Sequence, residues 1–270
     1  MFFPIGDTQV QGGYKPIFSY LFIAINIVVF IIQVTTPGNL VCEYSAIPID
    51  IIKGDSYYTL ITSMFMHGSW MHLIGNMLFL WVFADNIEAK VGNFTFLLFY
   101  IAGGLFASFA HIYFSTVSSD LTQIVCAPCS TNMPCDENLN VSSAVIPSLG
   151  ASGAISAVMG AYLLMFPSSK IKVLVLLFFR SFYVPALVFL GLWFVQQLFS
   201  GFGSLGPASS ASEGVAWWAH IGGFAFWSGC EFYLKAFVKK KQNTQVQPMD
   251  TKLVTAILYF TFFGQENLYQ

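Results

Sequence analysis

The sequence predicts an all-α polytopic membrane protein in which six transmembrane helices form one bundle. The first observation is composition: 56% of the 270 residues are hydrophobic and 9% are charged, whereas soluble domains carry about 25% charged residues. The second is that six apolar segments each approach the roughly 20 residues that cross a bilayer. The third is an unequal distribution of charge between alternate loops. A net charge of −2 is too small to indicate a nucleic-acid partner.

Each predicted span is an apolar run bounded by polar or Gly/Pro-rich sequence. The predicted spans cover, in order, residues 17–34, 70–84, 94–114, 148–166, 185–199 and 215–238. The chain therefore divides into a short cytoplasmic N-terminal segment at 1–16, a six-helix membrane domain at 17–238 and a cytoplasmic tail at 239–270. In the tail, the apolar stretch 253–263 is too short to span and is expected to lie in the interface. Residues 266–270 resemble an incomplete viral-protease cleavage site used in recombinant expression, so they are excluded from functional reasoning.

Local sequence explains several boundaries between the predicted elements. Pro185 suits the first turn of the fifth span, and the glycine pair at 103–104 gives the third span a face for close packing. The half-apolar stretch 46–52 is expected to lie in the membrane interface. Residues 85–93, which include Glu88, are expected to form a tight polar turn between the second and third spans.

The distribution of charge predicts the orientation, because cytoplasmic loops are enriched in lysine and arginine. If consecutive loops alternate between two sides, one side holds Lys15, Lys90, Lys170, Lys172, Arg180, Lys235 and Lys239 to Lys241. The other side holds Lys53 as its one basic residue, with Glu43, Asp50, Asp55, Asp120, Asp136, Glu137 and Glu213. We expect the basic side and both termini to face the cytoplasm of a bacterial or archaeal plasma membrane.

The fourth span begins with a serine between small residues, Gly150-Ala151-Ser152-Gly153. Small neighbours leave Ser152 accessible, and glycine lets other backbone approach closely. The helix N-terminus adds unpaired N–H groups and a partial positive charge, which suit a developing oxyanion. A lone serine in a span is more often a packing residue, so a catalytic role needs support from other residues.

Three polar residues from two other spans are predicted at the depth of Ser152. His72 and Asn76 share one helix face near the outer end of the second span, and His220 lies near the outer end of the sixth. Taken singly, each fits an interfacial residue or an interhelical hydrogen bond. Together they indicate function, because polar groups within spans are costly. His67 precedes its span, and we expect it to support the loop.

Small residues predict how these helices meet. Ser152, Ser156 and Gly160 recur every four residues, and a glycine pair at 222–223 follows the histidine. Such faces let membrane helices approach closely, which would bring Ser152 Oγ within hydrogen-bond reach of a His220 nitrogen. No acidic residue lies nearby in the spans, so the sequence predicts a serine–histidine dyad rather than a triad. His220 would act first as general base and then as general acid.

Three segments, in this order, resemble the rhomboid family of intramembrane serine proteases. They are His72-Leu-Ile-Gly-Asn76, Gly150-Ala-Ser152-Gly153 and Ala219-His220-Ile-Gly-Gly223, with support from Glu88-Ala-Lys-Val-Gly92 and Phe65-Met-His67. The likeness covers about residues 17–238. It implies a rhomboid-like six-helix bundle with a short fourth helix and an active site in a water-filled dip open to the outer side.

The resemblance also implies the roles of individual residues. Ser152 is the expected nucleophile of a serine endopeptidase and His220 its base, while His72, Asn76, Gly150 and Ser152 are expected to bind the oxyanion. Family substrates are single-span membrane proteins, cut near the outer end of a span that unwinds easily. The fifth helix resembles the element proposed to admit them from the side. The expected partners are substrate spans and membrane lipid, with no cofactor, metal or nucleic acid.

The chain departs from many relatives at three places. Ser156 stands where many have a tyrosine packed on the catalytic imidazole, and Trp227 stands where a glycine is common. A Trp-Arg pair frequent in the first loop is replaced at 57–59 by Tyr-Tyr-Thr. These differences bear on rate and substrate preference rather than on the reaction.

Cysteines cluster on the side predicted to be outside. Cys126, Cys129 and Cys135 lie in the long loop at 115–147, and Cys42 lies in the first loop. An oxidising exterior is consistent with one or two disulfides, whose pairing the sequence leaves open. Cys126-Ala-Pro-Cys129 is also compatible with a metal site, but no further cluster of ligands lies nearby, so disulfides are favoured.

Two other classes of function compete with the protease. A non-catalytic rhomboid-like scaffold that binds client transmembrane helices would be unaffected by Ser152→Ala. A small transporter would show inverted repeats or broken helices with ionisable groups at the midplane. The sequence has no such repeat, and its polar groups cluster near one face, so the scaffold is the stronger alternative.

Overall fold

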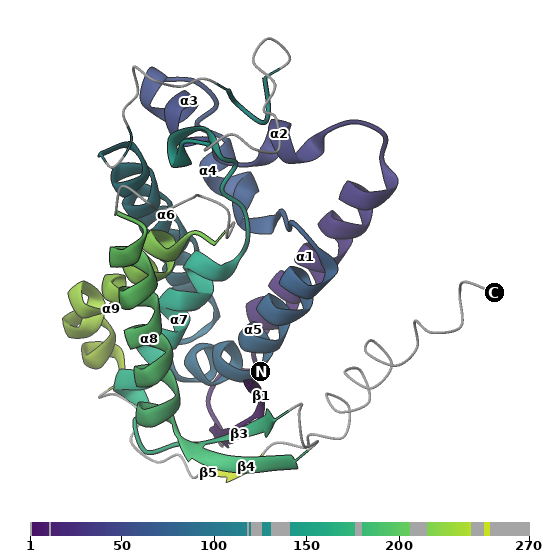
Figure 1. Cartoon of the computed structure of the whole chain (residues 1–270). Coiled ribbons are helices and arrows are strands. Elements are labelled where there is room, and N and C mark those ends of the chain that lie inside the picture. The colour runs from purple at the N-terminus through teal and green to yellow at the C-terminus, as the bar shows by residue number, and fades with distance from the viewer. Residues whose placement is uncertain are drawn as a thin grey trace.

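The structure is a computed structural model of the 270-residue chain. It describes residues 2–10, 12–117, 119, 126–130, 141–175, 180–205, 215–238 and 246–248, and it describes side chains within these ranges except at 2, 9, 10, 228–238 and 246–248. Helices dominate the described residues (Figure 1). Those of 14 residues or more are α1 (Phe18–Thr35), α5 (Trp70–Val91), α6 (Asn93–Val117), α7 (Ser152–Met165), α8 (Ala186–Gly203) and α9 (Trp217–Val238).

Each of these helices overlaps one predicted span, in the predicted order. Among the described residues, α1, α6 and α8 are long and apolar enough to cross a membrane, and α7 is a shorter apolar helix. The molecule is therefore mostly helical with the apolar helices of a membrane protein. The count of six spans stays a prediction.

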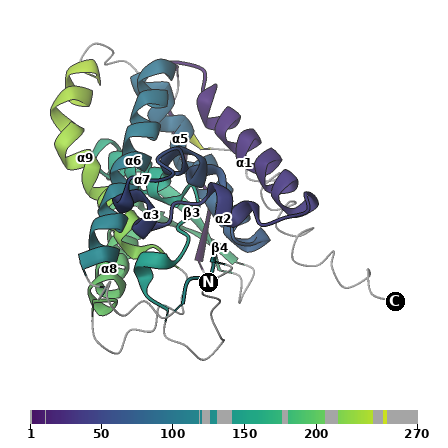
Figure 2. The same cartoon turned by 90° about the horizontal axis from the view of Figure 1, so that it is seen from above.

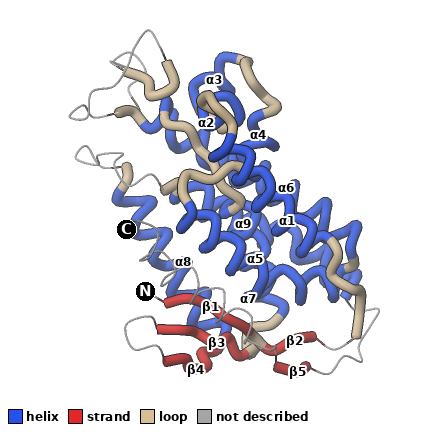
Figure 3. Tube along the Cα trace, turned by 90° about the vertical axis from the view of Figure 1, so that its right-hand side faces the viewer, coloured by secondary structure: helices blue, strands red, loops and turns tan. Residues whose placement is uncertain are grey.

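Short helices gather at one end of the bundle (Figures 1 and 3). They are α2 (Leu40–Tyr44), α3 (Pro48–Lys53), α4 (Thr59–Thr62) and the 3-10 helix η1 (Ser63–Phe65). The stretch 46–52, expected at the membrane interface, contributes α3, which has a proline in its first turn and ends at Gly54 with φ +94°. Helix α3 packs against α6 and so covers the end of the bundle.

The expectation of an all-α fold is wrong at the opposite end, where the strands lie (Figure 3). One antiparallel sheet joins β1 (Phe2–Gly6), β3 (Lys170–Val175) and β4 (Arg180–Pro185) in the order β1-β3-β4, and β2 (Thr8–Val10) pairs with β5 (Val246–Pro248). The register places Phe3 opposite Leu174 and Ile171 opposite Val184. In β3, exposed Lys170 is followed by buried Ile171. This period of two indicates a strand, but mean hydropathy does not detect it.

Helix α5 continues past the predicted end of its span, so the polar turn expected at 85–93 is wrong. Glu88 is fully buried. Its carboxylate accepts hydrogen bonds from the backbone N–H groups of Ile17, Phe18 and Ser19 at 2.7–2.9 Å, and from the Ser19 hydroxyl at 2.6 Å. N–H groups at a helix start have no partner within the helix, so Glu88 caps α1 from a neighbouring helix.

Charged residues separate between the two ends of the bundle. Lys170, Lys172 and Arg180 lie on the hairpin of β3 and β4, whereas Glu43 and Asp50 lie on α2 and α3 at the other end (Figure 1). This separation agrees with the asymmetry expected from the sequence. It concerns the ends of the molecule, and the direction in which they face across a membrane stays a prediction.

The short helix α7 lies inside the bundle. Seen from above, α1 and α9 lie on opposite sides, with α5, α6 and α7 between them (Figure 2). Residues 153–162 of α7 are all buried, and the helix packs against α5, α6, α8 and α9. Its first residue, Ser152, is therefore surrounded by protein on several sides.

Candidate active site

Ser152 is the first residue of α7 and meets His220 of α9. The Ser152 Oγ lies 2.8 Å from His220 Nε2, a hydrogen-bond distance that suits a nucleophile and its base. Because α7 begins at Ser152, the N–H groups of its first turn have no partners within the helix. The two residues of the predicted dyad are thus brought into contact from positions 68 residues apart.

Glycines explain why α6, α7 and α9 come so close. A Cβ atom on Gly223 would lie 2.1 Å from the carbonyl oxygen of Gly153, and one on Gly160 would lie 2.6 Å from the carbonyl oxygen of Phe224. A Cβ on Gly153 would meet the Cβ of Ala107 at 2.6 Å. Larger residues at these positions would force the helices apart, as the pattern of small residues predicts.

His72 and Asn76 of α5 lie against Gly150, two residues before the serine. A Cβ on Gly150 would lie 2.8 Å from the His72 ring atoms Cε1 and Nε2 and 3.5 Å from Asn76 Nδ2. Gly150 has a φ of +122°, which residues with side chains rarely adopt. Glycine therefore makes room for both predicted oxyanion donors beside the start of α7.

The loop before α7 is held by backbone hydrogen bonds to the end of the bundle that carries the short helices. The N–H of Gly150 donates to the carbonyl oxygen of Ser63 at 2.9 Å, and Ala46 and Ser148 exchange two backbone hydrogen bonds of 3.0 and 2.8 Å. In this arrangement Gly150 gives the site space rather than a hydrogen-bond donor, because its N–H group is bonded to the carbonyl oxygen of Ser63.

His67 contacts Asn76 directly. His67 is fully buried, and its Nε2 lies 2.9 Å from Asn76 Nδ2. Burial, followed by the proximity of His72, lowers the pKa of His67 to about 4, so the ring is neutral at pH 7 and its Nε2 is able to accept an amide hydrogen. Gln33 of α1 binds the backbone of His67, donating to its carbonyl at 2.6 Å and accepting from its N–H at 3.1 Å. His67 therefore supports Asn76 as well as the loop.

One polar neighbour of the site was missed by the sequence reasoning. Gln197 of α8 is buried, and its Oε1 lies 2.8 Å from the second ring nitrogen of His220, Nδ1. Trp193, one turn earlier on α8, has its ring centroid 5.8 Å from that of His220. Ser156, at the position of the common tyrosine, instead donates to the carbonyl oxygen of Ser152 at 2.6 Å. A glutamine within an apolar span was the available signal.

A cavity of about 20 Å³ adjoins Ser152 between α6, α7, α9 and the loop before α7. Its lining includes Ser63, Ser108, Ser148 and Ser152. A cavity of this size holds about one water molecule when polar partners are present. The site therefore has room for a small group next to the serine hydroxyl.

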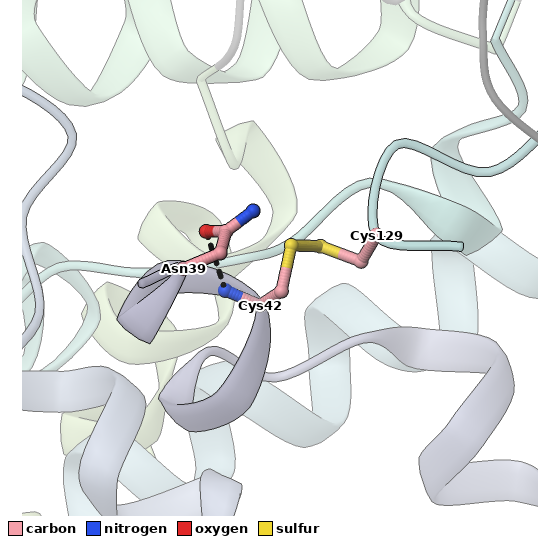
Figure 4. The surroundings of a disulfide bond; sticks show 3 residues. All are labelled: Asn39, Cys42 and Cys129. Carbon is pink, nitrogen blue, oxygen red and sulfur yellow. Dashed lines mark hydrogen bonds between the residues drawn. A yellow bond between two sulfur atoms is a disulfide. The ribbon is translucent and has the colours of Figure 1, made fainter. Parts of the chain in front are cut away.

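A disulfide joins Cys42 of α2 to Cys129, 87 residues later, with Cα atoms 5.4 Å apart (Figure 4). The side chain of Asn39 caps α2 beside it by accepting from the Cys42 N–H at 3.3 Å. Cys126 is also disulfide-bonded, which confirms the preference for disulfides, while Cys135 lies outside the described residues. Within the described part of the chain, no group of three or more His, Cys, Asp or Glu side chains is placed to hold a metal ion.

A family model described as Rhomboid domain matches residues 54–236 of the chain. This range contains Ser152, His220, His72, Asn76 and Gln197 and excludes α1.

Three curated relatives extend this likeness. The chain is 30% identical over 164 residues to rhomboid protease GluP of Bacillus subtilis, a match covering 59% of this chain and 26% of that protein. It is 29% identical over 117 residues to presenilin-associated rhomboid-like protein A, mitochondrial, of Danio rerio, covering 43% and 24%. It is 24% identical over 229 residues to rhomboid protein 1, mitochondrial, of Saccharomyces cerevisiae, covering 84% and 56%. The chain thus spans about a quarter to a half of the length of these relatives, which come from a bacterium and from mitochondria.

Proposed function

Because this chain belongs to the rhomboid family, we propose that it is an intramembrane serine endopeptidase with Ser152 as nucleophile and His220 as base. The single observation that carries the proposal is the 2.8 Å contact between Ser152 Oγ and His220 Nε2. A hydroxyl paired with an imidazole nitrogen at the start of a buried helix is the arrangement that nucleophilic catalysis requires. A relative with 30% identity carries the name of a protease.

The first half of the reaction forms an acyl-enzyme. Ser152 Oγ attacks the carbonyl carbon of the scissile peptide bond as its proton moves to His220 Nε2. The tetrahedral intermediate then collapses, the C–N bond breaks, and His220 gives the same proton to the leaving amine. The amine product carries away the C-terminal part of the substrate.

The oxyanion of the tetrahedral intermediate forms beside the start of α7. We assign its stabilisation to the side chains of His72 and Asn76 and to the backbone N–H of Ser152. The assignment is supported by the position of both side chains against Gly150 and by the unpaired N–H groups and positive end of the α7 dipole. Donors fixed in a buried site stabilise developing charge without reorganising.

The second half of the reaction requires water. His220 Nε2 removes a proton from a water molecule, which attacks the acyl carbon, and the proton then returns to Ser152 Oγ as the C–O bond breaks. The small cavity next to Ser152, whose lining includes four serines, supports this step, because it offers space for one water among polar residues.

We further propose that the substrates are single-span membrane proteins cut near the outer end of the span. Ser152 lies towards the end of the bundle that carries the acidic residues and the disulfide, since the loop before it bonds to Ser63 and Ala46. If the basic end faces the cytoplasm, the serine lies near the opposite membrane surface. The disulfide between Cys42 and Cys129 is consistent with an oxidising compartment on that side.

Cleavage of a defined substrate tests the proposal. Purified protein, in detergent and in liposomes, is incubated with a single-span test substrate, and mass spectrometry locates the cut. We expect one cut near the outer membrane end of the substrate, which Ser152→Ala and His220→Ala both abolish. Ser156→Ala is the matched control, because it removes a buried serine hydroxyl one turn away on the same helix and should leave cleavage in place.

The competing function is a non-catalytic scaffold for client helices. It predicts no cut by the native protein and no labelling of Ser152 by a fluorophosphonate, together with client binding that Ser152→Ala leaves unchanged. That set of results would replace the protease with the scaffold.

A further inference from the structure

Gln197 is the one polar side chain among the buried residues of helix α8. The buried residues of α8 are Ala186, Leu190, Gln197 and Gly201, which follow one face at helical spacing. Gln197 is 3% exposed. A buried amide is costly without a hydrogen-bond partner, and the partner that the structure gives its Oε1 is the His220 ring.

The identity of the atoms in this contact matters for the proposed base. Gln197 Oε1 lies 2.8 Å from His220 Nδ1, while His220 Nε2 lies 2.8 Å from Ser152 Oγ. An amide oxygen has no hydrogen to donate, so the ring must carry its proton on Nδ1 to make this bond. A neutral imidazole has one N–H, so Nε2 is then left as the acceptor for the serine hydroxyl.

A second side chain on the same helix face restrains the ring. Trp193 precedes Gln197 by one helical turn, and its ring packs 5.8 Å from the imidazole between centroids. Helix α8 thus supplies both a packing surface and a hydrogen-bond acceptor to a histidine of α9. Ser156 is too short to pack on the imidazole and instead bonds to the backbone of its own helix.

We propose that Gln197 is a positioning residue for His220. Its side-chain oxygen accepts the Nδ1 hydrogen, selects the tautomer with a free Nε2 and fixes the plane of the ring towards Ser152. The role is the one that a buried carboxylate performs in a serine–histidine–aspartate triad, here filled by a neutral amide that needs no desolvated charge. The inference rests on the proposed protease function, and its test separates the two.

The main variant is Gln197→Met, which keeps an unbranched side chain of similar length and removes the strong acceptor. We expect kcat for the single-span substrate to fall about 10- to 100-fold with KM unchanged, because substrate binding is untouched while the base is less often in the required tautomer. Gln197→Glu restores an acceptor for Nδ1–H and should recover part of the lost kcat. Gln196→Met is the matched control, since Gln196 is the exposed neighbour on the same helix, and it should retain native kcat.

A spectroscopic readout reports the tautomer without any substrate. In protein labelled with ¹⁵N-histidine, the His220 signals are identified by their loss in His220→Ala, and we expect a protonated Nδ1 in the native protein. Gln197→Met should reduce this signature and Gln196→Met should preserve it. Native kcat in a folded Gln197→Met, or an Nε2-protonated His220 in the native protein, would overturn the positioning role. If the native protein cuts nothing, the protease proposal fails, and the ¹⁵N signature alone decides whether Gln197 holds the ring.

Discussion

Asn76 has two amide hydrogens, and its Nδ2 contacts His67 Nε2 at 2.9 Å. Because a neutral ring accepts one hydrogen, the second remains for an acceptor near Ser152. The contact also fixes the amide so that nitrogen rather than oxygen faces Gly150. One buried histidine thus sets the direction of a proposed oxyanion donor.

Asn76→Ala is expected to lower kcat about 10²-fold or more, since removal of one preorganised oxyanion donor costs roughly that factor. The measurement is steady-state cleavage of the single-span substrate, with thermal unfolding in detergent as a check on folding. Gly75→Ala is the matched control, because a Cβ there meets nothing within 4 Å, and it should cleave normally. Unchanged turnover in Asn76→Ala would remove Asn76 from the oxyanion site.

At the residue scale, the polar residues within the motifs could be predicted from the sequence, but the glutamine that contacts the histidine could not. Ser152 and His220 were singled out together because they are polar residues at one expected depth, and the structure brings them to 2.8 Å. Gln197 was not found, because the sequence does not show which of the two adjacent glutamines, Gln196 and Gln197, faces the bundle. Its proposed role depends on the rotation of α8 about its axis, which is determined by packing against α7 and α9.

At the scale of elements, Glu88 connects two helices that are distant in the sequence. Its carboxylate accepts from the first N–H groups of α1 and from the Asn93 side chain at 2.9 Å. The start of α1 has no side-chain cap from its own residues. The N-terminus of α1 is therefore stabilised by α5 rather than by local sequence.

Glu88→Ala is expected to reduce the free energy of unfolding by about 3 kcal/mol or more, because several buried and part-buried donors lose their acceptor together. Glu88→Gln keeps one acceptor oxygen and should cost less. Denaturant or thermal unfolding in detergent measures both. Glu43→Ala, at an exposed glutamate of α2, should stay within about 0.5 kcal/mol of the native protein. An equal effect of the two alanine variants would contradict the capping role.

The predicted elements failed where tertiary contacts override local pattern. The six long helices were expected from apolar runs, and each lies where a run predicts it. The polar stretch 85–93 was expected to be a turn, but burial of Glu88 under α1 keeps it helical. Strand β1 was missed because its partner β3 is distant in the sequence. The local hairpin of β3 and β4 was missed because mean hydropathy does not detect the period of two.

At the scale of the whole molecule, the disulfide between Cys42 and Cys129 links helix α2 to the loop segment 126–130, at the end opposite the sheets. It closes 87 residues of chain, which include α5 and α6. In the chain-entropy account, a loop of this length stabilises the folded state by up to about 4–5 kcal/mol. The bond acts on the unfolded chain and does not touch the proposed catalytic residues.

Cys42→Ser and Cys129→Ser are each expected to lower the midpoint of thermal unfolding by several degrees while leaving cleavage at 25 °C in place. The double variant should unfold at the same temperature as either single variant, because all three lack the same bond. Differential scanning fluorimetry in detergent makes the comparison. Additive losses in the double variant would show that the two thiols contribute separately.

The separation of charge between the two ends was predictable, since it depends only on which loops share a side. Which end faces the cytoplasm depends on the cell that inserts the chain, and the relatives come from a bacterium and from mitochondria. The prediction of membrane orientation therefore rests on the distribution of charge alone.

Helix α8 is held differently from its neighbours. Glycine contacts with backbone or Cβ atoms bring α6, α7 and α9 together, whereas the tight glycine contact of α8 is with the end of an α9 side chain. Helix α8 also leaves Leu192, Val195 and Phe199 exposed. A displacement of α8 by about 1 Å would lengthen the Gln197–His220 contact beyond a hydrogen bond. The position of this helix and the tautomer of the ring then form one linked equilibrium, and linkage is reciprocal. A ligand at Ser152 that favours the Nδ1-protonated ring would draw α8 against the bundle with the same coupling free energy.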